Sequence, residues 1–297
     1  MSYPAIKAVL ASFLFSPLVA WAAGRITVEN VGLASPESVV HDTVDDVYYV
    51  SNINGGIADK DGNGFISRVA PDGSVLALKW ADGANDGTTL HAPKGLAIAG
   101  RTLYVADIDT VRLFDLATGK PQGEVPIPGA TFLNGLAALP SGEVVGTESA
   151  LLVDGTTVTP TKKDFIYRIG TDRRVAVVAQ TPELNQPNGI AVLASGQFLV
   201  STRGAAEVYE LTLGGEKRNV RTLPGTIVDG VGLAPDGRIF ASSWETSEVY
   251  TVTPDGQVST PFGKLAVPAA DFHFDLQRGR ILLPLLRANS LVFAPLS

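Results

Sequence analysis

The chain of 297 residues carries 23 Lys and Arg against 30 Asp and Glu, which gives a formal net charge of −7. This acidic balance disfavours nucleic-acid binding, because nucleic-acid sites need clustered basic side chains. The absence of cysteine excludes disulfides, thiolate nucleophiles and cysteine-ligated zinc or iron–sulfur sites. The three histidines, His41, His91 and His273, are too scattered for a zinc-protease motif.

The first 22 residues are typical of a secretory signal peptide. A short apolar run follows Lys7, and Ala20-Trp-Ala22 offers a small-x-small cleavage pattern. An uncleaved membrane anchor is the alternative, although the apolar run is short for a membrane span. We therefore expect residues 1–22 to be removed and residues 23–297 to be exported, to the periplasm or outside the cell, with no membrane attachment.

A repeat runs through the rest of the chain. Each copy begins with a polar residue and continues as apolar runs that alternate with period two, separated by Gly, Pro and Asp turns. The copies begin at Glu37, Lys94, Asn134, Asn188 and Asp229, and the last begins at Ala270 or Asp271. Six copies of roughly 40–55 residues with four strands each predict an all-β fold, a single six-bladed β-propeller with four-stranded antiparallel blades.

The ends of the repeat predict how the ring closes. The last copy is one strand short, whereas residues 26–31 alternate and belong to no copy. We expect residues 26–31 to supply the missing outer strand beside residues 290–294, because closure removes an exposed sheet edge. Residues 54–64 and 150–164 are insertions relative to the shorter blades and are predicted to be loops.

The repeat also predicts a ring of polar side chains. The first residue of each copy enters the innermost strand, so these residues should surround one mouth of the central channel. The carboxylate and amide oxygens of Glu37, Asn134, Asn188 and Asp229 suit a hard cation such as Ca²⁺, Mg²⁺ or Mn²⁺, which would also neutralise converging carboxylates. The alternative is that Asn-Gly and Asp-Gly are turn dipeptides, favoured because these residues tolerate a positive φ.

Four of these places resemble the signature motifs of one family. The family is that of senescence marker protein, gluconolactonase and luciferin-regenerating enzyme, which includes regucalcin. The motifs are Pro36-Glu37, Phe132-Leu-Asn134-Gly, Gln186-Pro-Asn188-Gly-Ile and Val228-Asp229-Gly-Val. The resemblance covers about the whole of residues 23–297, and residues 48–56 and 60–67 look closest to bacterial exported members.

The resemblance implies one divalent cation at the channel mouth, with Ca²⁺ expected first and Mn²⁺, Mg²⁺ or Zn²⁺ as alternatives. It implies Glu37, Asn188 and Asp229 as ligands, with Asp229 doubling as general base. It also implies that Asn134 binds the ion or the substrate. Two departures matter, because Phe132 stands where lactonases of the family often have an arginine, and Lys94 enters the ring. Lys94 would bind an anionic substrate or partly replace the charge of the metal.

Residues 59–67 match the first nine places of an EF-hand loop. Asp59, Asp61 and Asn63 would be the oxygen ligands of a second Ca²⁺ site. The twelfth place holds Ala70 instead of a bidentate Glu, and no helical pattern flanks the loop. A Gly- and Asp-rich surface turn is therefore the alternative.

Other polar residues have ordinary structural explanations. We expect His91 to be a hydrogen-bonded loop residue, with a proton shuttle at the channel mouth as the alternative. His273 is expected in the core or the channel wall, and Asp107 and Asp109 are interpreted as strand-end acids. Neither a nucleophile elbow nor a phosphate-binding loop motif is present.

Two functions fit these patterns. The first is a metal-dependent hydrolase of small-molecule lactones or related esters, in which Asp229 moves a proton and Asn134 and Lys94 orient the substrate. The second is a non-enzymatic propeller that binds a ligand or a protein at the same mouth, as NHL-type propellers do. With no cysteine and one closed ring, we expect a monomer or a weak dimer.

Overall fold

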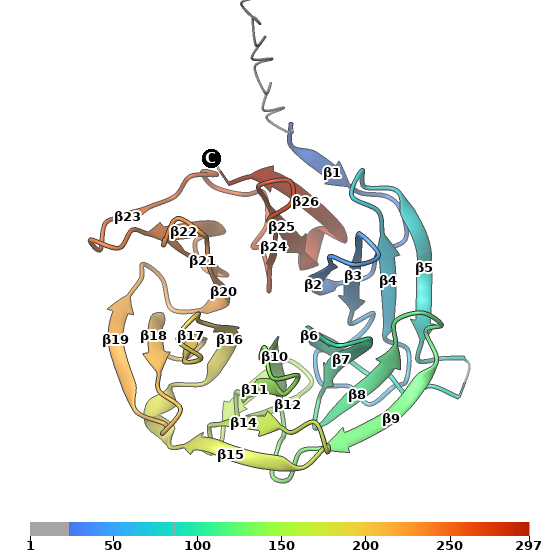
Figure 1. The fold of residues 1–297 in the computed structure, drawn as a ribbon, viewed down its shortest axis with the longest axis horizontal. Helices are drawn as coiled ribbons and strands as arrows, with labels where there is room; N and C mark the ends of the chain where they lie inside the picture. The colour runs from blue at the N-terminus through green and yellow to red at the C-terminus, as the bar shows by residue number, and fades with distance from the viewer. Residues whose placement is uncertain (1–23, 86, 297) are drawn as a thin grey trace, which may run out of the picture.

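The strands form six four-stranded antiparallel sheets around a central channel, as Figure 1 shows. The structure is a computed structural model that describes residues 24–85 and 87–296, so the predicted signal peptide lies outside it. The all-β, six-bladed propeller predicted from the repeat is confirmed. The prediction succeeds because period-two alternation with Gly, Pro and Asp turns encodes short antiparallel strands directly.

Each blade runs from an innermost to an outermost strand. The first blade consists of β2 (Pro36–Asp42), β3 (Val47–Asn52), β4 (Phe65–Val69) and β5 (Val75–Asp82). The second blade consists of β6 (Pro93–Ala99), β7 (Thr102–Asp107), β8 (Thr110–Asp115) and β9 (Pro121–Pro126). The third blade consists of β10 (Leu133–Ala138), β11 (Val144–Glu148), β14 (Phe165–Ile169) and β15 (Val175–Gln180). The fourth blade consists of β16 (Pro187–Val192), β17 (Phe198–Thr202), β18 (Glu207–Leu211) and β19 (Lys217–Thr222). The fifth blade consists of β20 (Val228–Leu233), β21 (Ile239–Ser243), β22 (Glu248–Val252) and β23 (Val258–Ser259). The sixth blade consists of β24 (His273–Asp275), β25 (Arg280–Leu285), β26 (Ser290–Pro295) and β1 (Ile26–Val28).

The ring closes as predicted. Strand β1 pairs antiparallel with β26, and Val28 lies opposite Leu291. Strand β1 ends at Val28, three residues before the end of the predicted segment 26–31. The first strand of the chain thus completes the last blade and covers its outer edge.

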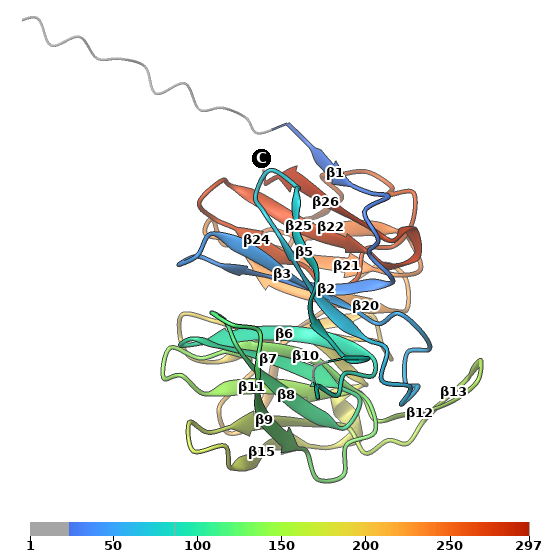
Figure 2. The same ribbon diagram turned by 90° about the vertical axis from the view of Figure 1, so that its right-hand side faces the viewer.

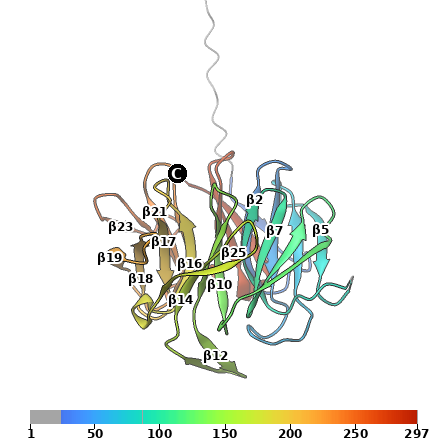
Figure 3. The same ribbon diagram turned by 60° about the horizontal axis from the view of Figure 1, so that its bottom comes forward.

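The two insertions have different structures. Residues 54–64 form a loop between β3 and β4, as expected. The prediction of a loop is wrong for residues 150–164, because strands β12 (Leu151–Asp154) and β13 (Thr157–Pro160) pair as a hairpin. Its alternating Val and Thr residues favour extended backbone, and Gly155 supplies a positive φ of 56° at the turn. Figures 2 and 3 show this hairpin reaching beyond the blades.

The hydrophobic core is divided among the blade interfaces. Six clusters of buried apolar side chains each join residues from two neighbouring blades, and one of them joins the last blade to the first. The helices of the described ranges are the 3₁₀ turns η1 (Pro182–Leu184) and η2 (Leu286–Ala288), and neither has the length or apolarity needed to cross a membrane. Each blade thus packs on both of its neighbours, and we expect closure to contribute to the stability of the whole ring.

The closing strand offers a matched test of this dependence. Val28 is buried in the cluster between the last and first blades, whereas its neighbour Thr27 on the same strand is exposed. We expect Val28→Asp to lower the free energy of unfolding by about 3 kcal/mol, because it places an unpaired charge in that cluster. Thr27→Asp should cost about 1 kcal/mol or less. Urea unfolding measures both values, and equal losses would show that β1 does not seal the ring.

Candidate functional site

Five of the predicted ring residues meet at one mouth of the channel. Glu37, Lys94, Asn134, Asn188 and Asp229 line one cavity of about 390 Å³, and each exposes 6% or less of its surface. Each residue lies near the start of the innermost strand of a different blade. Residues that share one position in the sequence repeat are therefore brought together in one cavity.

The sixth place of the ring belongs to Ala270. The Ser242 hydroxyl donates a hydrogen bond to the carbonyl oxygen of Ala270 over 2.9 Å, as the Ser201 hydroxyl does to the carbonyl of Asp229. Asp271, the other residue considered for this place, instead lines a pocket at the opposite end of the channel. The innermost strand of the sixth blade therefore adds no polar side chain to the ring.

A β-bulge sits at the ring residue in each of the first five blades. The pairing between the first two strands shifts by one residue at Pro36/Val39, Pro93/Leu96, Leu133/Leu136, Pro187/Ile190 and Val228/Val231. Such a bulge bends a strand and redirects a side chain. It is the local feature that every ring residue shares.

Neighbouring inner strands nearly touch at the residue after the ring position. A Cβ atom added to Gly135 would lie 2.6 Å from the carbonyl oxygen of Asn188, and one added to Gly189 would lie 2.5 Å from that of Asp229. Neither glycine has a positive φ. The turn-dipeptide alternative is therefore wrong here, because these glycines serve close backbone approach within strands.

Hydroxyl groups on the second strands hold this arrangement. The amide of Gly135 donates to Thr147 Oγ1 and the amide of Gly189 donates to Ser201 Oγ, each over 2.9 Å. Thr147 in turn donates to the carbonyl of Asn188 in the next blade. One hydroxyl thus satisfies the buried amide of the bulge and links two blades, a role that the sequence reading missed.

Acidic residues at the ends of second strands fix the loops that lead into the inner strands. Glu148 accepts the backbone amide of Phe132 over 3.0 Å, and Asp107 accepts those of His91 and Ala92 over 3.0 and 2.9 Å. Asp107 is therefore a strand-end acid, as interpreted.

The predicted loop residues also take structural positions. His91 Nδ1 accepts the Gly62 amide over 3.0 Å, and His91 does not line the cavity. It is a hydrogen-bonded loop residue, as expected. Asp109, the other strand-end acid, forms a salt bridge of 2.5 Å with Lys60.

Three oxygens of the ring have no partner. Glu37 Oε2, Asn188 Oδ1 and Asp229 Oδ1 are buried and accept no hydrogen bond. The second polar atoms of two of these side chains are occupied, since Asn188 Nδ2 donates to the Val228 carbonyl over 3.1 Å and Trp244 Nε1 donates to Asp229 Oδ2. Buried oxygens without partners are costly, so their presence in one cavity calls for a ligand that they would bind.

The chemistry of these three oxygens fits a hard divalent cation. Two carboxylates would balance the charge of the cation, and an amide oxygen is a common further ligand. Within the described ranges no group of three or more His, Asp or Glu side chains is placed to hold a metal. The ring differs from such a group because amide oxygens complete its donor set.

The cavity shifts the pKa values of its charged groups. Burial raises the pKa of Glu37 well above its usual value, and the charges of Asp229 and Asp271 add to this, while Lys94 opposes it. Burial raises the pKa of Asp229 to about 6, against the lowering effects of the Trp244 hydrogen bond and the Arg203 charge. Burial lowers the pKa of Lys94, which Glu37 counteracts. A bound cation would relieve the unfavourable burial of both carboxylates.

The two remaining ring residues present donors to the cavity. Asn134 Nδ2 donates to Ser149 Oγ over 3.3 Å, and Lys94 Nζ donates to the Ala92 carbonyl over 3.1 Å. Lys94 also lies over the Phe132 ring, with Nζ 4.4 Å from the ring centroid. Phe132, which replaces the arginine of the resembled lactonases, therefore supports the lysine that joins the ring.

Sequence reading missed a second ring in the cavity wall. In four of the six blades the residue that follows the second strand lines the cavity, namely Ile53, Arg203, Trp244 and Leu286. The signal was available, because these residues share a repeat position just as the polar ring does. It was overlooked because their side chains have no chemistry in common.

The predicted second Ca²⁺ loop is surface-exposed at two of its three residues. Asp59 and Asp61 are exposed, and Asp61 accepts the Asn63 side-chain amide over 2.7 Å. Asn63 Oδ1 is buried without a partner. Ca²⁺ binding by this loop stays a prediction.

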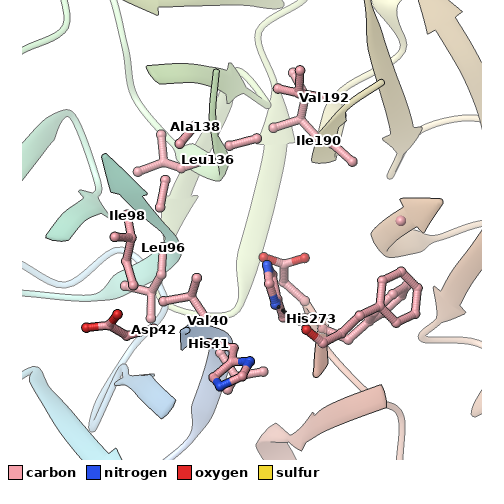
Figure 4. Close-up of a pocket in the computed structure, with 18 of the residues that line it drawn as sticks. Val40, His41, Asp42, Leu96, Ile98, Leu136, Ala138, Ile190, Val192 and His273 are labelled. Atoms are coloured by element: carbon pink, nitrogen blue, oxygen red, sulfur yellow. Dashed lines mark hydrogen bonds between the residues drawn. The ribbon is translucent and has the colours of Figure 1, made fainter. Parts of the chain in front are cut away.

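The opposite end of the channel is a separate pocket of about 490 Å³, lined by apolar side chains together with His41, Asp42, Asp271 and His273. Figure 4 shows His41 and His273 there, with Val40, Leu96 and Ile190 from the inner strands. His273 thus belongs to the channel wall, one of its two expected locations, and lies apart from the polar ring.

Comparison with known proteins places the fold. No protein family and no curated protein matches the chain. A gluconolactonase from Xanthomonas campestris has 19% sequence identity and a TM-score of 0.69, over 91% of this chain and 88% of the other. This chain has the propeller fold of a gluconolactonase.

The same fold occurs in proteins of other kinds. A virginiamycin B lyase from Staphylococcus aureus has 12% identity and a TM-score of 0.63, over 91% of this chain and 98% of the lyase. A chain of a nidogen/laminin complex has 18% identity and a TM-score of 0.59, over 76% and 80% of the two chains. These likenesses show a shared architecture, so function must be argued from the site.

The shifted pKa of Asp271 should make the stability of the protein depend on pH. Burial and the nearby Asp229 raise the pKa of Asp271 to about 7, although Ser38 Oγ donates to its carboxylate over 2.8 Å. In the unfolded chain this pKa lies near about 4. The folded state therefore binds the proton more tightly, and the wild type loses stability as the pH rises from about 4 to about 7.

Replacing Asp271 by Asn removes this loss. We expect the free energy of unfolding of Asp271→Asn, relative to wild type, to rise between pH 4.5 and pH 7.5. Urea unfolding in the presence of a chelator measures the difference at each pH. A difference that stays constant would mean that Asp271 titrates normally in the folded protein.

Proposed function

We propose that this protein is a hydrolase of lactones or related esters that depends on one divalent cation. The observation that carries the proposal is the set of three buried, unpartnered oxygens of Glu37, Asn188 and Asp229 in one cavity. The signature motifs around these residues resemble those of the gluconolactonase family. The propeller fold of a gluconolactonase supports the same reading.

Glu37, Asn188 and Asp229 would hold the cation, with Asn134 as a further ligand or a substrate contact. Ca²⁺ is the first candidate, and Mn²⁺, Mg²⁺ or Zn²⁺ are alternatives. When bound, such a cation supplies a Lewis acid that polarises a carbonyl oxygen.

Asp229 is the proposed proton carrier. Trp244 holds Asp229 Oδ2, which leaves Oδ1 free toward the cavity. Burial raises the pKa of Asp229 in the cavity without a cation, and a bound cation would lower it again. The proposed role of Asp229 therefore rests on its place in the signature motif and on its unpartnered Oδ1. Asp229 would take a proton from the attacking water as the new carbon–oxygen bond forms, and return it to the alkoxide oxygen that leaves when the ring opens.

The other residues would bind and enclose the substrate. Lys94 and Asn134 would orient polar groups, and Ile53, Ile57 and Leu286 form an apolar part of the wall. An apolar wall limits water around the reacting groups and strengthens the polar contacts inside the cavity.

Two other functions occur on this fold. A catalytically inactive virginiamycin B lyase carries an alanine in place of a histidine. No histidine lines the proposed site among the described residues, which disfavours a histidine-dependent lyase. A non-enzymatic propeller is the stronger alternative, since a chain of the nidogen/laminin complex shares the architecture. The buried charged cavity favours a small molecule over a protein partner.

Cation binding is tested by thermal unfolding. Because a ligand of the folded state stabilises it by mass action, millimolar Ca²⁺ or Mn²⁺ should raise the melting temperature of the wild type. Glu37→Gln and Asp229→Asn should keep the fold and show a much smaller rise, since each removes one ligand charge.

The predicted second Ca²⁺ loop, residues 59–63, supplies the control for the thermal-unfolding measurement. Asp61→Asn should respond to the cation as the wild type does, because Asp61 lies outside the cavity. A loss of response in Asp61→Asn, together with a normal response in the two ring variants, would place the cation at residues 59–63.

Hydrolysis is tested with a panel of lactones. The wild type should hydrolyse at least one aliphatic lactone, and a chelator should abolish the activity until the cation is restored. Asp229→Asn should lose about a hundredfold or more in rate, the scale of a missing general base. Cation binding without any turnover across the panel would favour the non-enzymatic alternative.

A further inference from the structure

The cavity carries more positive charge than the proposed reaction uses. Lys94, Arg203 and Arg287 line it, and Glu37 and Asp229 are the carboxylates in its described lining. One divalent cation would balance those two carboxylates. Three basic side chains then remain without a compensating charge.

None of the three basic groups pairs with a carboxylate among the described residues. Lys94 contacts a backbone carbonyl and an aromatic ring, Arg203 Nη1 lies 3.5 Å from Gln186 Oε1, and the Arg287 guanidinium lies 5.2 Å from the centroid of the Trp244 ring. Burial lowers the pKa of Arg203, and only the nearby Asp229 opposes this.

Several arginines elsewhere in the blades pair with carboxylates, whereas Arg68, Arg173 and Arg221 have no carboxylate partner among the described residues. Arg112 lies 3.1 Å from Asp107, and Arg280 lies 3.1 Å from Asp275. The protein as a whole is acidic, with a net charge of −7. What distinguishes the three basic groups at the mouth is that they line one cavity, together with the proposed cation ligands, in a protein that is acidic as a whole.

The three groups surround the cavity. Lys94 comes from β6 in the second blade, Arg203 follows β17 in the fourth blade, and Arg287 lies in η2 of the sixth blade. Because they come from alternate blades, they approach the cavity from three sides. Their charges add at its centre, where the low dielectric of the walls strengthens attraction for an anion.

We propose that the site takes a lactone that carries an anionic group, a carboxylate or a phosphate, and that Arg203 and Arg287 bind this group. The proposal rests on the proposed function for its lactone part. The guanidinium fork suits both kinds of oxyanion, and the Trp244 ring supports Arg287 in position. Hydrolysis then converts the lactone and one water into a hydroxy acid whose new carboxylate releases its proton to solvent.

Stable open-chain acids test the anion site without any turnover. Gluconate has one carboxylate, glucarate has a second at the far end of the same chain, and 6-phosphogluconate has a phosphate there. Calorimetry on the Ca²⁺-loaded protein should show glucarate or 6-phosphogluconate binding at least about tenfold more tightly than gluconate. The stronger of the two identifies the anionic group.

Three variants assign this preference to residues. Arg203→Gln and Arg287→Gln should each reduce the preference severalfold, with a smaller effect on gluconate. Arg221→Gln is the matched control, because Arg221 lies on the outer strand β19, far from the cavity lining, and also lacks a carboxylate partner. Its preference should equal that of the wild type.

The outcomes separate this proposal from the proposed function. No preference in the wild type, or a preference that survives both cavity replacements, overturns the anion site. If Arg203→Gln weakens all three acids equally and tightens Ca²⁺, Arg203 only balances Asp229 and the proposal fails for that residue. Cation-dependent hydrolysis of neutral glucono-1,4-lactone without any anion preference would support the proposed function alone. An arginine-dependent preference without hydrolysis would support the anion site alone.

Discussion

The close approach of neighbouring inner strands is the contact on which the site depends. At Gly135 and Gly189 the backbones of adjacent blades come so near that a methyl group would collide with a carbonyl oxygen. The preceding residue is therefore forced to the edge of the channel, where the bulge directs its side chain into the mouth. Gly95 makes the same contact with the carbonyl oxygen of Asn134, and the β-bulge recurs in all five blades whose polar side chains reach the cavity.

This arrangement is held from outside the ring. Hydroxyls of the second strands satisfy the bulge amides and bond to the carbonyl of the next blade, and strand-end acids fix the loops before the inner strands. Three oxygens of the ring, Glu37 Oε2, Asn188 Oδ1 and Asp229 Oδ1, are thereby left without a structural hydrogen bond. Glu37 and Asp229 can stay buried with unpartnered oxygens because side chains outside the ring accept the hydrogen bonds of the neighbouring backbone amides.

The buried charges at the channel mouth are only partly compensated within the protein, and bound ligands of opposite charge would compensate them further. Burial works against the ionised forms of Glu37, Asp229 and Lys94 alike. A cation beside the carboxylates and an anion beside the basic groups would each relieve part of this cost. A site built this way gains more from binding a pair of opposite charges than from binding either one.

The sequence by itself determined the propeller, its blade count and the polar ring, because each is a pattern repeated at one place in the copies. It also determined the closure, because the last copy lacks a strand that residues 26–31 can supply. It left the sixth place open between Ala270 and Asp271, and only the hydrogen bond from Ser242 to Ala270 decided it. It also missed the hairpin in residues 150–164 and the basic residues Arg203 and Arg287. Only the tertiary structure showed that those two arginines share a cavity with Lys94, because the three residues belong to blades far apart along the chain and occupy different places in the repeat. The free oxygens of the ring were likewise decided by packing, since hydrogen-bond partners depend on neighbouring strands that no single repeat contains.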